Sequence, residues 1–327
     1  MIGYAYRRVT PPLKPCLPTG RGAGGCRGCR GCRNPRERGY LHRIGGILFF
    51  VLLSVAVCFG QRLSRPPVFG IAKMTYLVSD YQLARDYYGT FLGFDEAFSY
   101  PSALGEVISF KVNDRQFLEF VQDKAAGDKT RLVSVSFETN DVEQMRVYLQ
   151  SCNVEVPEAV TVDGAGNRVI LVHDDAGIPV EFIDLNPNSL HKKTAGRFLS
   201  PNRISKRIHH AGLFTKEVIE HPHFYKDILG CREFFKSPDE PGEKLVILYL
   251  QLPDCVEFIE HYSDPNPNIS HPCLVAESMQ EVMYTLKERN GNRPVAQASV
   301  GRGRKFILNI RNADGTRVEF IEPFNVR

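Results

Sequence analysis

The stretch RVEFIEP, residues 317–323, places the carboxylate of Glu319 between two apolar side chains in what should be a strand. Variants of the phrase recur as FLEF, PVEF and CVEF, with their carboxylates at Glu119, Glu181 and Glu257. Successive carboxylates are 62, 76 and 62 residues apart. Such regular spacing indicates internal repetition, so the chain beyond about residue 70 is predicted to hold four copies of one unit.

Each unit is predicted to open with a strand and to continue with a helix. The opening strands are expected at 71–78, 132–138, 208–214 and 271–277, and the helices at 80–93, 141–152, 220–230 and 278–290. Apolar residues three and four positions apart favour the helices. Asp80 and Asp141 are expected as N-caps, and Gly93 and Gly230 as C-caps. Three β-rich segments follow each helix, so each unit reads βαβββ.

One such unit has too few helices to bury both faces of its sheet, so the units should pair. The predicted fold is therefore α+β, with four βαβββ units paired into two domains that have curved, cup-shaped mixed sheets. The domains are expected at residues 68–187 and 204–325, joined by a polar linker at 188–203. Strand alternation places Val318 and Phe320 on one face of the last strand and Glu319 on the other, inside the cup.

The first 60 residues have a different composition from the rest. Residues 1–43 are rich in Arg, Gly and Cys, hold ten Arg/Lys against the single acid Glu37, and are predicted to be disordered or a wrongly assigned start. Residues 44–60 form an apolar run behind a basic flank, which is typical of a signal peptide or membrane anchor. The protein is therefore expected to be exported, either to the periplasm or outside the cell, or anchored with its body outside the cytoplasm.

Charge in the body of the chain limits the class of partner. Without residues 1–43, the chain has 31 basic and 36 acidic residues. A mildly acidic body without a basic patch argues against nucleic acid as a partner. The expected partner is a small-molecule substrate, and the sequence identifies no protein partner.

Two strand-helix phrases carry a resemblance to a known family. YLVSDYQLARDYYGTFLGF, residues 76–94, and HHAGLFTKEVIEHPHFYKDILGC, residues 209–231, resemble the opening of the repeat unit in the vicinal oxygen chelate superfamily. That superfamily contains glyoxalase I, extradiol dioxygenases and bleomycin-resistance proteins. The resemblance implies two tandem domains of this fold, with metal ligands on the first and last strands of paired units.

The second predicted domain offers a ligand set at those positions: His210, Glu257, His271 and Glu319. Two imidazoles and two carboxylates suit one divalent ion, such as Zn, Ni, Fe(II) or Mn. Glu257 is expected to be either a ligand or the catalytic acid/base. His209, next to His210, is expected on the opposite face of the sheet.

The first predicted domain departs from this pattern. Its four equivalent positions hold Lys73, Glu119, Ser134 and Glu181, with a lysine and a serine where imidazoles should be. An ammonium beside two carboxylates would form a salt bridge in the cup and replace the charge of the metal. This half is therefore predicted to have a degenerate metal site.

Three functions follow from the resemblance. The preferred one is an exported metal-dependent enzyme acting on a small substrate with vicinal oxygens, by glyoxalase-like isomerase or lyase chemistry through a metal-stabilised enediolate, with Glu257 as the base. The alternative is an Fe(II) extradiol dioxygenase, against which Asn309 counts, because that family places a tyrosine there. The third is a non-enzymatic, resistance-type binding protein. Arg302, Arg304 and Lys305 indicate either an anionic substrate or a solvated basic loop.

Overall fold

The computed structural model describes residues 63–124, 131–238, 243–263, 270–291 and 294–325. The predicted leader and apolar segment, residues 1–43 and 44–60, lie outside the described residues. Within the described ranges, no helix has the length and apolar character needed to cross a membrane. Arg62–Arg327 forms one compact unit.

The first of two eight-stranded sheets has the strand order β2-β3-β4-β1-β5-β8-β7-β6. Its strands are β1 Gly70–Val78, β2 Asp95–Ser102, β3 Gly105–Lys111, β4 Phe117–Gln122, β5 Leu132–Glu138, β6 Thr161–Val162, β7 Arg168–His173 and β8 Pro179–Asp184. β1 is parallel to β4, β5 is parallel to β8, and β1 and β5 meet antiparallel at the centre. The two halves of the sheet therefore repeat one pattern.

The second sheet has the same plan, with the order β10-β11-β12-β9-β13-β16-β15-β14. Its strands are β9 Ile208–Thr215, β10 Arg232–Ser237, β11 Ile247–Gln251, β12 Phe258–Ser263, β13 His271–Val275, β14 Ser299–Val300, β15 Lys305–Arg311 and β16 Arg317–Asn325. The predicted α+β fold of four βαβββ units paired into two mixed sheets is confirmed. The sheets lie within the predicted ranges 68–187 and 204–325.

Helices begin and end close to the predicted residues in three of the four units. The helices in the described part of the chain are α2 Tyr81–Ala84, which continues as the π-helix η1 Arg85–Phe91, then α3 Val142–Ser151, the short α4 Leu190–Lys193, the π-helix η2 Phe224–Ile228, and α5 Met279–Arg289. Asp80 and Asp141 cap α2 and α3 by accepting backbone N–H bonds from Gln82 and Gln144. Gly93 and Gly230 have φ of +80° and +77°, as expected of C-caps.

The third helix is shorter than the predicted 220–230. η2 begins at Phe224, whose backbone N–H donates to Asp175 Oδ2 at 2.8 Å. Asp175 lies in the turn between β7 and β8, so a carboxylate from a different unit satisfies a donor at the start of this helix. No local sequence pattern reveals a cap of that kind.

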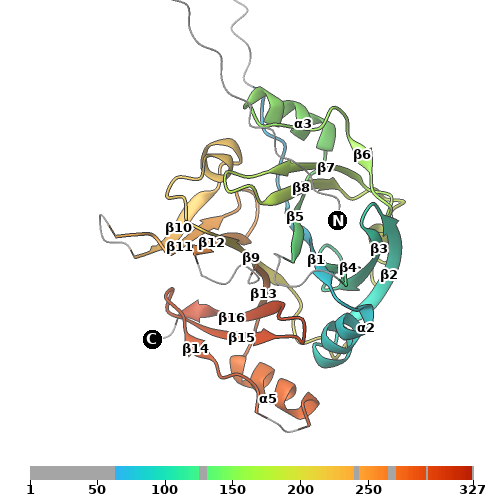
Figure 1. Ribbon diagram of the computed structural model, residues 1–327, viewed down its shortest axis with the longest axis vertical. Coiled ribbons are helices and arrows are strands. Elements are labelled where there is room, and N and C mark those ends of the chain that lie inside the picture. Colours follow the sequence, from blue (N-terminus) through green and yellow to red (C-terminus); the bar gives the residue numbers. More distant parts are fainter. Residues whose placement is uncertain (1–62, 125–130, 239–242, 264–269, 292–293, 326–327) are drawn as a thin grey trace, which may run out of the picture. The chain divides into compact units, whose positions relative to one another are not determined.

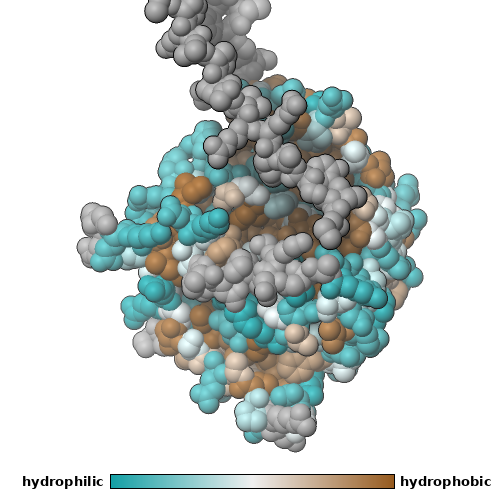
Figure 2. Space-filling model, in the orientation of Figure 1, coloured by the Kyte–Doolittle hydropathy of each residue, from teal (hydrophilic) through white to brown (hydrophobic). Residues whose placement is uncertain are grey.

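Helices α2, α3 and α5 lie on the outer sides of the sheets (Figure 1), and their buried residues belong to the main apolar core. Val318 and Phe320 on β16 are fully buried in that core, while Glu319 projects from the other face of the strand, as predicted. On the face shown in Figure 2, hydrophobic residues form separate groups among hydrophilic ones.

The segment predicted to be a polar linker, residues 188–203, packs against the first sheet. Its His191 is 1% exposed and reaches Glu119 inside the cup. Lys111 Nζ donates to the carbonyl oxygens of Thr194 and Arg197. The polar residues of this segment therefore satisfy buried groups of the first sheet, which their composition alone does not show.

Candidate metal centre

Four strands of the second sheet bring together the side chains of His210, Glu260, His271 and Glu319, whose ligand atoms all lie within 4.8 Å of one another. His210 Nε2 lies 3.4 Å from Glu260 Oε2 and 3.6 Å from Glu319 Oε1. His271 Nε2 lies 4.0 Å from Glu260 Oε2 and 3.8 Å from Glu319 Oε2. Three of the four residues are those predicted from the sequence, and Glu257 is absent from the cluster.

The strand register explains why these side chains meet. β13 lies between β9 and β16, and its Cys273 faces both His210 and Glu319. His271, two residues earlier on the same face, pairs with Gly212 of β9, and Glu260 of β12 pairs with the same glycine from the other side. Residues two apart on a strand share a face, so all four side chains enter one cup.

Gly212 leaves the space that the ring of His271 occupies. A Cβ on Gly212 would lie 2.1 Å from His271 Cε1 and 2.7 Å from its Nε2. In the first sheet, the same register position is Thr75, which pairs with Ser134 and with Glu119. The glycine is therefore specific to the half of the chain that carries the imidazoles.

Gly212→Ala is expected to displace the His271 ring and to weaken divalent-ion binding by about 10-fold or more, since small shifts of ligands have such effects. Equilibrium dialysis with Zn²⁺ measures the change. Gly303→Ala is the matched control, because a Cβ there meets nothing within 4 Å. Equal zinc affinity in the two variants would show that the ring position does not govern binding.

Two tyrosine hydroxyls hold the imidazole rings by their Nδ1 atoms. Tyr249 Oη contacts His210 Nδ1, and Tyr262 Oη lies 3.5 Å from His271 Nδ1. Both Nε2 atoms then face the carboxylates, and His210 Nε2 is buried without a hydrogen-bond partner among the described residues. A ring whose Nδ1–H donates to an oxygen presents the Nε2 lone pair to a metal, so these contacts favour the ligand tautomer.

Arg317 fixes the orientation of Glu319. Its Nη2 donates to Glu319 Oε2 at 2.6 Å, and its Nε donates to Asn309 Oδ1 at 2.5 Å. Although burial opposes the charged form, Glu319 raises the pKa of Arg317. Asn309 thus occupies the position where the resemblance places a tyrosine, and it acts here on the carboxylate through Arg317.

Glu257, predicted as a ligand or base, lies elsewhere. Its Oε2 accepts from the backbone N–H of Ile71 at 2.5 Å, and its Oε1 accepts from Gln116 Nε2 at 2.8 Å. Burial raises the pKa of Glu257 to about 7. Glu257, the residue before β12, therefore joins the start of that strand to the first sheet, and the predicted placement at the metal cluster is wrong.

Glu257 was predicted in place of Glu260 because two similar sequence phrases were aligned with each other, whereas the strand register pairs different residues. CVEF at 255–258 resembles FLEF at 117–120, but the structure pairs Phe117 with Lys73 and Phe258 with His210. The counterpart of FLE is therefore FIE at 258–260, which places Glu260 opposite Glu119 in the repeat. Aligning the phrases by their leading phenylalanine would have found it.

A β-bulge changes the expected direction of His209. β9 pairs His210 with Cys273 and Ile208 with Leu274, which leaves His209 as an extra residue. Its Nδ1 lies 3.1 Å from His210 Nδ1, so both rings are on the same side and the predicted opposite direction is wrong. Burial lowers the pKa of His209 to about 2, and its ring is neutral.

The first sheet holds an ammonium where the second holds the imidazoles. Lys73 Nζ lies 3.2 Å from Glu119 Oε2 and 3.3 Å from Glu181 Oε1, which confirms the predicted salt bridge. Tyr100 donates its hydroxyl to Glu119 at 2.5 Å, and His191 Nε2 lies 3.0 Å from the other oxygen of that carboxylate. Glu119 is fully buried, and its negative charge is matched inside the protein.

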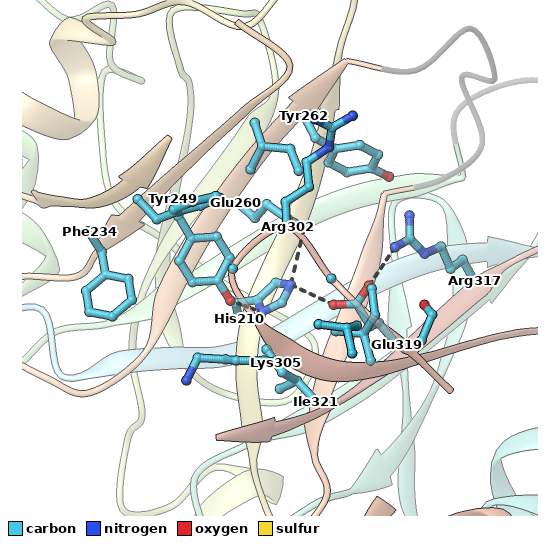
Figure 3. Close-up of a pocket in the computed structure, with 17 residues that line it drawn as sticks. His210, Phe234, Tyr249, Glu260, Tyr262, Arg302, Lys305, Arg317, Glu319 and Ile321 are labelled. Carbon is cyan, nitrogen blue, oxygen red and sulfur yellow. Dashed lines mark hydrogen bonds and ion pairs between the residues drawn. The ribbon is translucent and has the colours of Figure 1, made fainter. Parts of the chain in front are cut away.

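A pocket of about 440 Å³ opens onto the cluster of the second sheet. Figure 3 shows the His210 ring in its wall, between Tyr249 and Glu319. This volume is in the range of small-molecule sites. A substrate in the pocket would reach the faces of Glu260 and Glu319 directly.

The donor set fits a divalent transition metal. Zn–N and Zn–O bonds of about 2.0–2.2 Å place two ligands of one ion at most about 4.4 Å apart. The four separations of 3.4 to 4.0 Å between imidazole and carboxylate atoms lie within that limit. The buried Nε2 of His210, which has no hydrogen-bond partner among the described residues, also calls for a cation.

Comparison with solved structures bears on the fold. No protein-family model matches the chain. No curated protein matches it by sequence either. Among solved structures, it is similar to a mutant of homoprotocatechuate 2,3-dioxygenase from Brevibacterium fuscum, at 18% identity and a TM-score of 0.59, over 81% of this chain and 74% of that one.

Two further structures give the same result. The 2,3-dioxygenase LapB from Pseudomonas sp. KL28 has 16% identity and a TM-score of 0.59, over 79% of this chain and 93% of that one. An extradiol ring-cleaving dioxygenase from B. fuscum has 18% identity and a TM-score of 0.58, over 81% of this chain and 76% of that one. Together with the two sheets of paired βαβββ units, this likeness shows that the chain has the fold of the vicinal oxygen chelate superfamily, as its sequence predicts.

Proposed function

We propose that the protein is a metal-dependent enzyme that binds a small substrate through two neighbouring oxygens. The observation that carries the proposal is the convergence of His210, His271 and Glu319 beside a pocket, with His210 Nε2 buried and lacking a hydrogen-bond partner in the described chain. A divalent ion bound there would supply a Lewis acid for the two substrate oxygens.

The first candidate reaction is extradiol-type dioxygenation of a catechol-like substrate. Two imidazoles and one carboxylate form the donor set of non-haem Fe(II) oxygenases, which leaves positions open for substrate and oxygen. The dioxygenases similar in fold support this candidate. Here Glu319 would be the carboxylate of the set, because Arg317 already fixes its orientation.

Glu260 would then act as the proton acceptor of the site. Its carboxylate lines the pocket, with Oε2 3.4 Å from His210 Nε2. A carboxylate at that place can accept the proton of a substrate hydroxyl as the substrate binds. Tyr249 and Tyr262 keep the two rings in position during that transfer.

The second candidate is proton-transfer isomerisation, and Glu260 is the observation that favours it. Glu260 Oε2 lies as close to His210 Nε2 as the Glu319 oxygen does, at 3.4 against 3.6 Å. A fourth donor would leave room for the two substrate oxygens and none for dioxygen. In this reaction a carboxylate of the pair removes a proton from carbon.

Oxygen uptake separates the two candidates. The protein is loaded under anaerobic conditions with Fe(II), Zn²⁺, Ni²⁺ or Mn²⁺, and given catechols or a thiol–aldehyde adduct. Ring cleavage predicts oxygen consumption and a yellow ring-opened product with Fe(II), whereas isomerisation predicts product without oxygen. Uptake of metal and ligand with no product would support the non-enzymatic binding protein, and absence of metal binding would overturn the proposal.

Glu260→Gln is expected to lower activity by about 100-fold or more, because it removes the proton acceptor or a ligand from the site. Glu257→Gln is the matched control and should leave turnover near the wild-type value, since Glu257 lies outside the cluster. Steady-state kinetics with the active metal measures both variants. Greater loss in Glu257→Gln than in Glu260→Gln would contradict the assignment.

Export of the protein is a separate proposal that rests on residues 44–60 alone. Detection of the mature N-terminus in the native host tests it. Cleavage near Gly60 is the outcome expected for a signal peptide.

A further inference from the structure

The cup of the first sheet contains a pocket of about 510 Å³. Its lining includes the ammonium of Lys73 and the carboxylates of Asp163 and Glu181. Apolar side chains also line it, including those of Leu104, Val107, Val121, Val133 and Val169. A volume of this size is in the range of small-molecule sites. The half of the chain that lacks the imidazoles therefore retains a cavity with charged and apolar surfaces.

Three carboxylates share one ammonium in this cup. In addition to its contacts with Glu119 and Glu181, Lys73 Nζ lies 3.7 Å from Asp163 Oδ2. Lys73 is the only cationic side chain among the residues that line the pocket. Glu119 is fully buried beside that ammonium, so the excess of negative charge falls on Asp163 and Glu181 at the pocket.

The ring of His191 adds no positive charge to this cluster. One amide atom of Asn167, Nδ2, lies 3.1 Å from Asp163 Oδ2 and 2.9 Å from His191 Nδ1. Its contact with a carboxylate identifies this atom as the nitrogen, which can only donate, so His191 Nδ1 accepts and the ring is neutral. The ring proton is then on Nε2, which donates to Glu119 at 3.0 Å. The net charge of the cluster is therefore negative, which favours a cationic ligand.

Two hydroxyls in the same pocket lack hydrogen-bond partners. Thr75 and Ser134 lie opposite each other on β1 and β5, and each is 6% exposed. Both line the pocket, and neither hydroxyl has a hydrogen-bond partner in the described part of the chain. Buried hydroxyls are nearly always hydrogen-bonded, so these two indicate a polar ligand group beside them.

We propose that this pocket binds a small organic ammonium, that is, a primary amine attached to a compact apolar body. The ammonium has three N–H donors, which form charge-assisted hydrogen bonds to Asp163, Glu181 and one of the two hydroxyls. The apolar body packs against the side chains of Val107, Val121 and Val169.

The same observations argue against a metal ion in this cup. Lys73 already occupies the position between Glu119 and Glu181. A hydrated ion would also make no use of the apolar part of the lining. The site belongs to the first sheet, whereas the metal centre belongs to the second, and the inference does not depend on the proposed function.

Calorimetric titration of the full chain in the presence of a chelator tests the site. The probes are cyclohexylmethylamine and cyclohexylmethanol, which have the same apolar body and differ in charge at pH 7. The amine is expected to bind about 10- to 100-fold more tightly than the alcohol, because only its ammonium makes charge-assisted hydrogen bonds. The chelator keeps metal ions out of the second sheet, where the amine could bind to them.

Asp163→Asn and Glu181→Gln are each expected to weaken amine binding by about 10-fold or more and to leave the alcohol affinity unchanged, since each removes a charge and retains the side-chain size. Asp184→Asn is the matched control, because Asp184 lies on β8 with Glu181 but outside the pocket lining. Ser134→Ala keeps every charge and should weaken amine binding by about 2- to 10-fold. Thermal melting confirms that the variants are folded.

Three outcomes would overturn the inference. Equal binding of amine and alcohol, or no binding of either probe, excludes an ammonium site. An unchanged preference for the amine in both Asp163→Asn and Glu181→Gln places the bound amine outside this cup. Displacement of the amine by an equimolar amount of K⁺ assigns the pocket to inorganic cations. Zinc binding by the second sheet is a separate measurement, so none of these results bears on the proposed function.

Discussion

Replacement of His271 by alanine is expected to weaken divalent-ion binding by more than about a hundredfold, because even changes to the outer partners of a ligand cost about 10- to 100-fold. His271 is fully buried, and its Nε2 lies within 4.0 Å of both carboxylates of the cluster. His209 and Cys273 form a second candidate group with His210, but that group includes neither carboxylate of the cluster. The loss should therefore be complete at physiological metal concentrations.

Equilibrium dialysis with Zn²⁺ followed by elemental analysis measures this loss. His221→Ala is the matched control, because His221 is 61% exposed and its ring lies against Asp227, away from the cluster. One zinc ion per chain in wild type and in His221→Ala, with none in His271→Ala, is the expected pattern. Undiminished loading of His271→Ala would exclude His271 as a ligand.

Replacement of Lys73 by methionine is expected to destabilise the fold by about 3–5 kcal/mol, the usual cost of breaking a buried ion pair. Lys73 is 4% exposed, and its ammonium lies between the carboxylates of Glu119 and Glu181. Methionine fills a similar volume, but it leaves two negative charges close together with no cation between them. The effect is thus one of charge and not of packing.

Urea denaturation measures the change in the free energy of unfolding. Lys206→Met should have little effect, because Lys206 is 66% exposed where it faces Glu277. Adding Glu119→Gln to Lys73→Met should restore part of the stability by removing one of the unmatched charges. If the double variant is no more stable than Lys73→Met, the charge explanation fails.

The same cluster predicts a dependence of stability on pH. Burial acts to raise the pKa of Glu119, but Lys73 and His191 outweigh it and lower that pKa to about 2. The folded pKa is therefore below the unfolded value of about 4.3, so this stabilisation is present above that value and decreases as the pH falls towards 2. The stability difference between wild type and Lys73→Met should decrease over that range.

The repeat explains why the fold could be predicted from the sequence. Each unit repeats a phrase in which a carboxylate lies between apolar residues. Asp80 and Asp141 cap the starts of two helices, and Gly93 and Gly230 follow the ends of two. Such signals are local, since a strand or a cap depends on residues near it in sequence. Strand alternation likewise placed Glu319 in the cup correctly.

The parts of the site that were missed depend on contacts between distant residues. Glu260 enters the cluster because Phe258 pairs with His210. The repeated phrase indicates Glu257 instead, three residues earlier, so it does not reveal this register. His209 shares the face of His210 only because β9 contains a bulge. His191 reaches Glu119 from a segment whose polar composition indicates a linker. Register, bulges and long-range hydrogen bonds are properties of the folded sheet and are not encoded in any short phrase.

X-ray absorption at the zinc edge of the loaded protein tests the central claim most directly, because it reports the atoms bound to the ion. The account predicts two imidazole nitrogens and one or two carboxylate oxygens at about 2.0–2.2 Å, with either one imidazole nitrogen fewer or no bound zinc in His210→Ala. Sulfur neighbours would place the ion at the group of His209, His210 and Cys273. An unchanged imidazole signal in His210→Ala would place the ion away from His210. Either result would contradict the account.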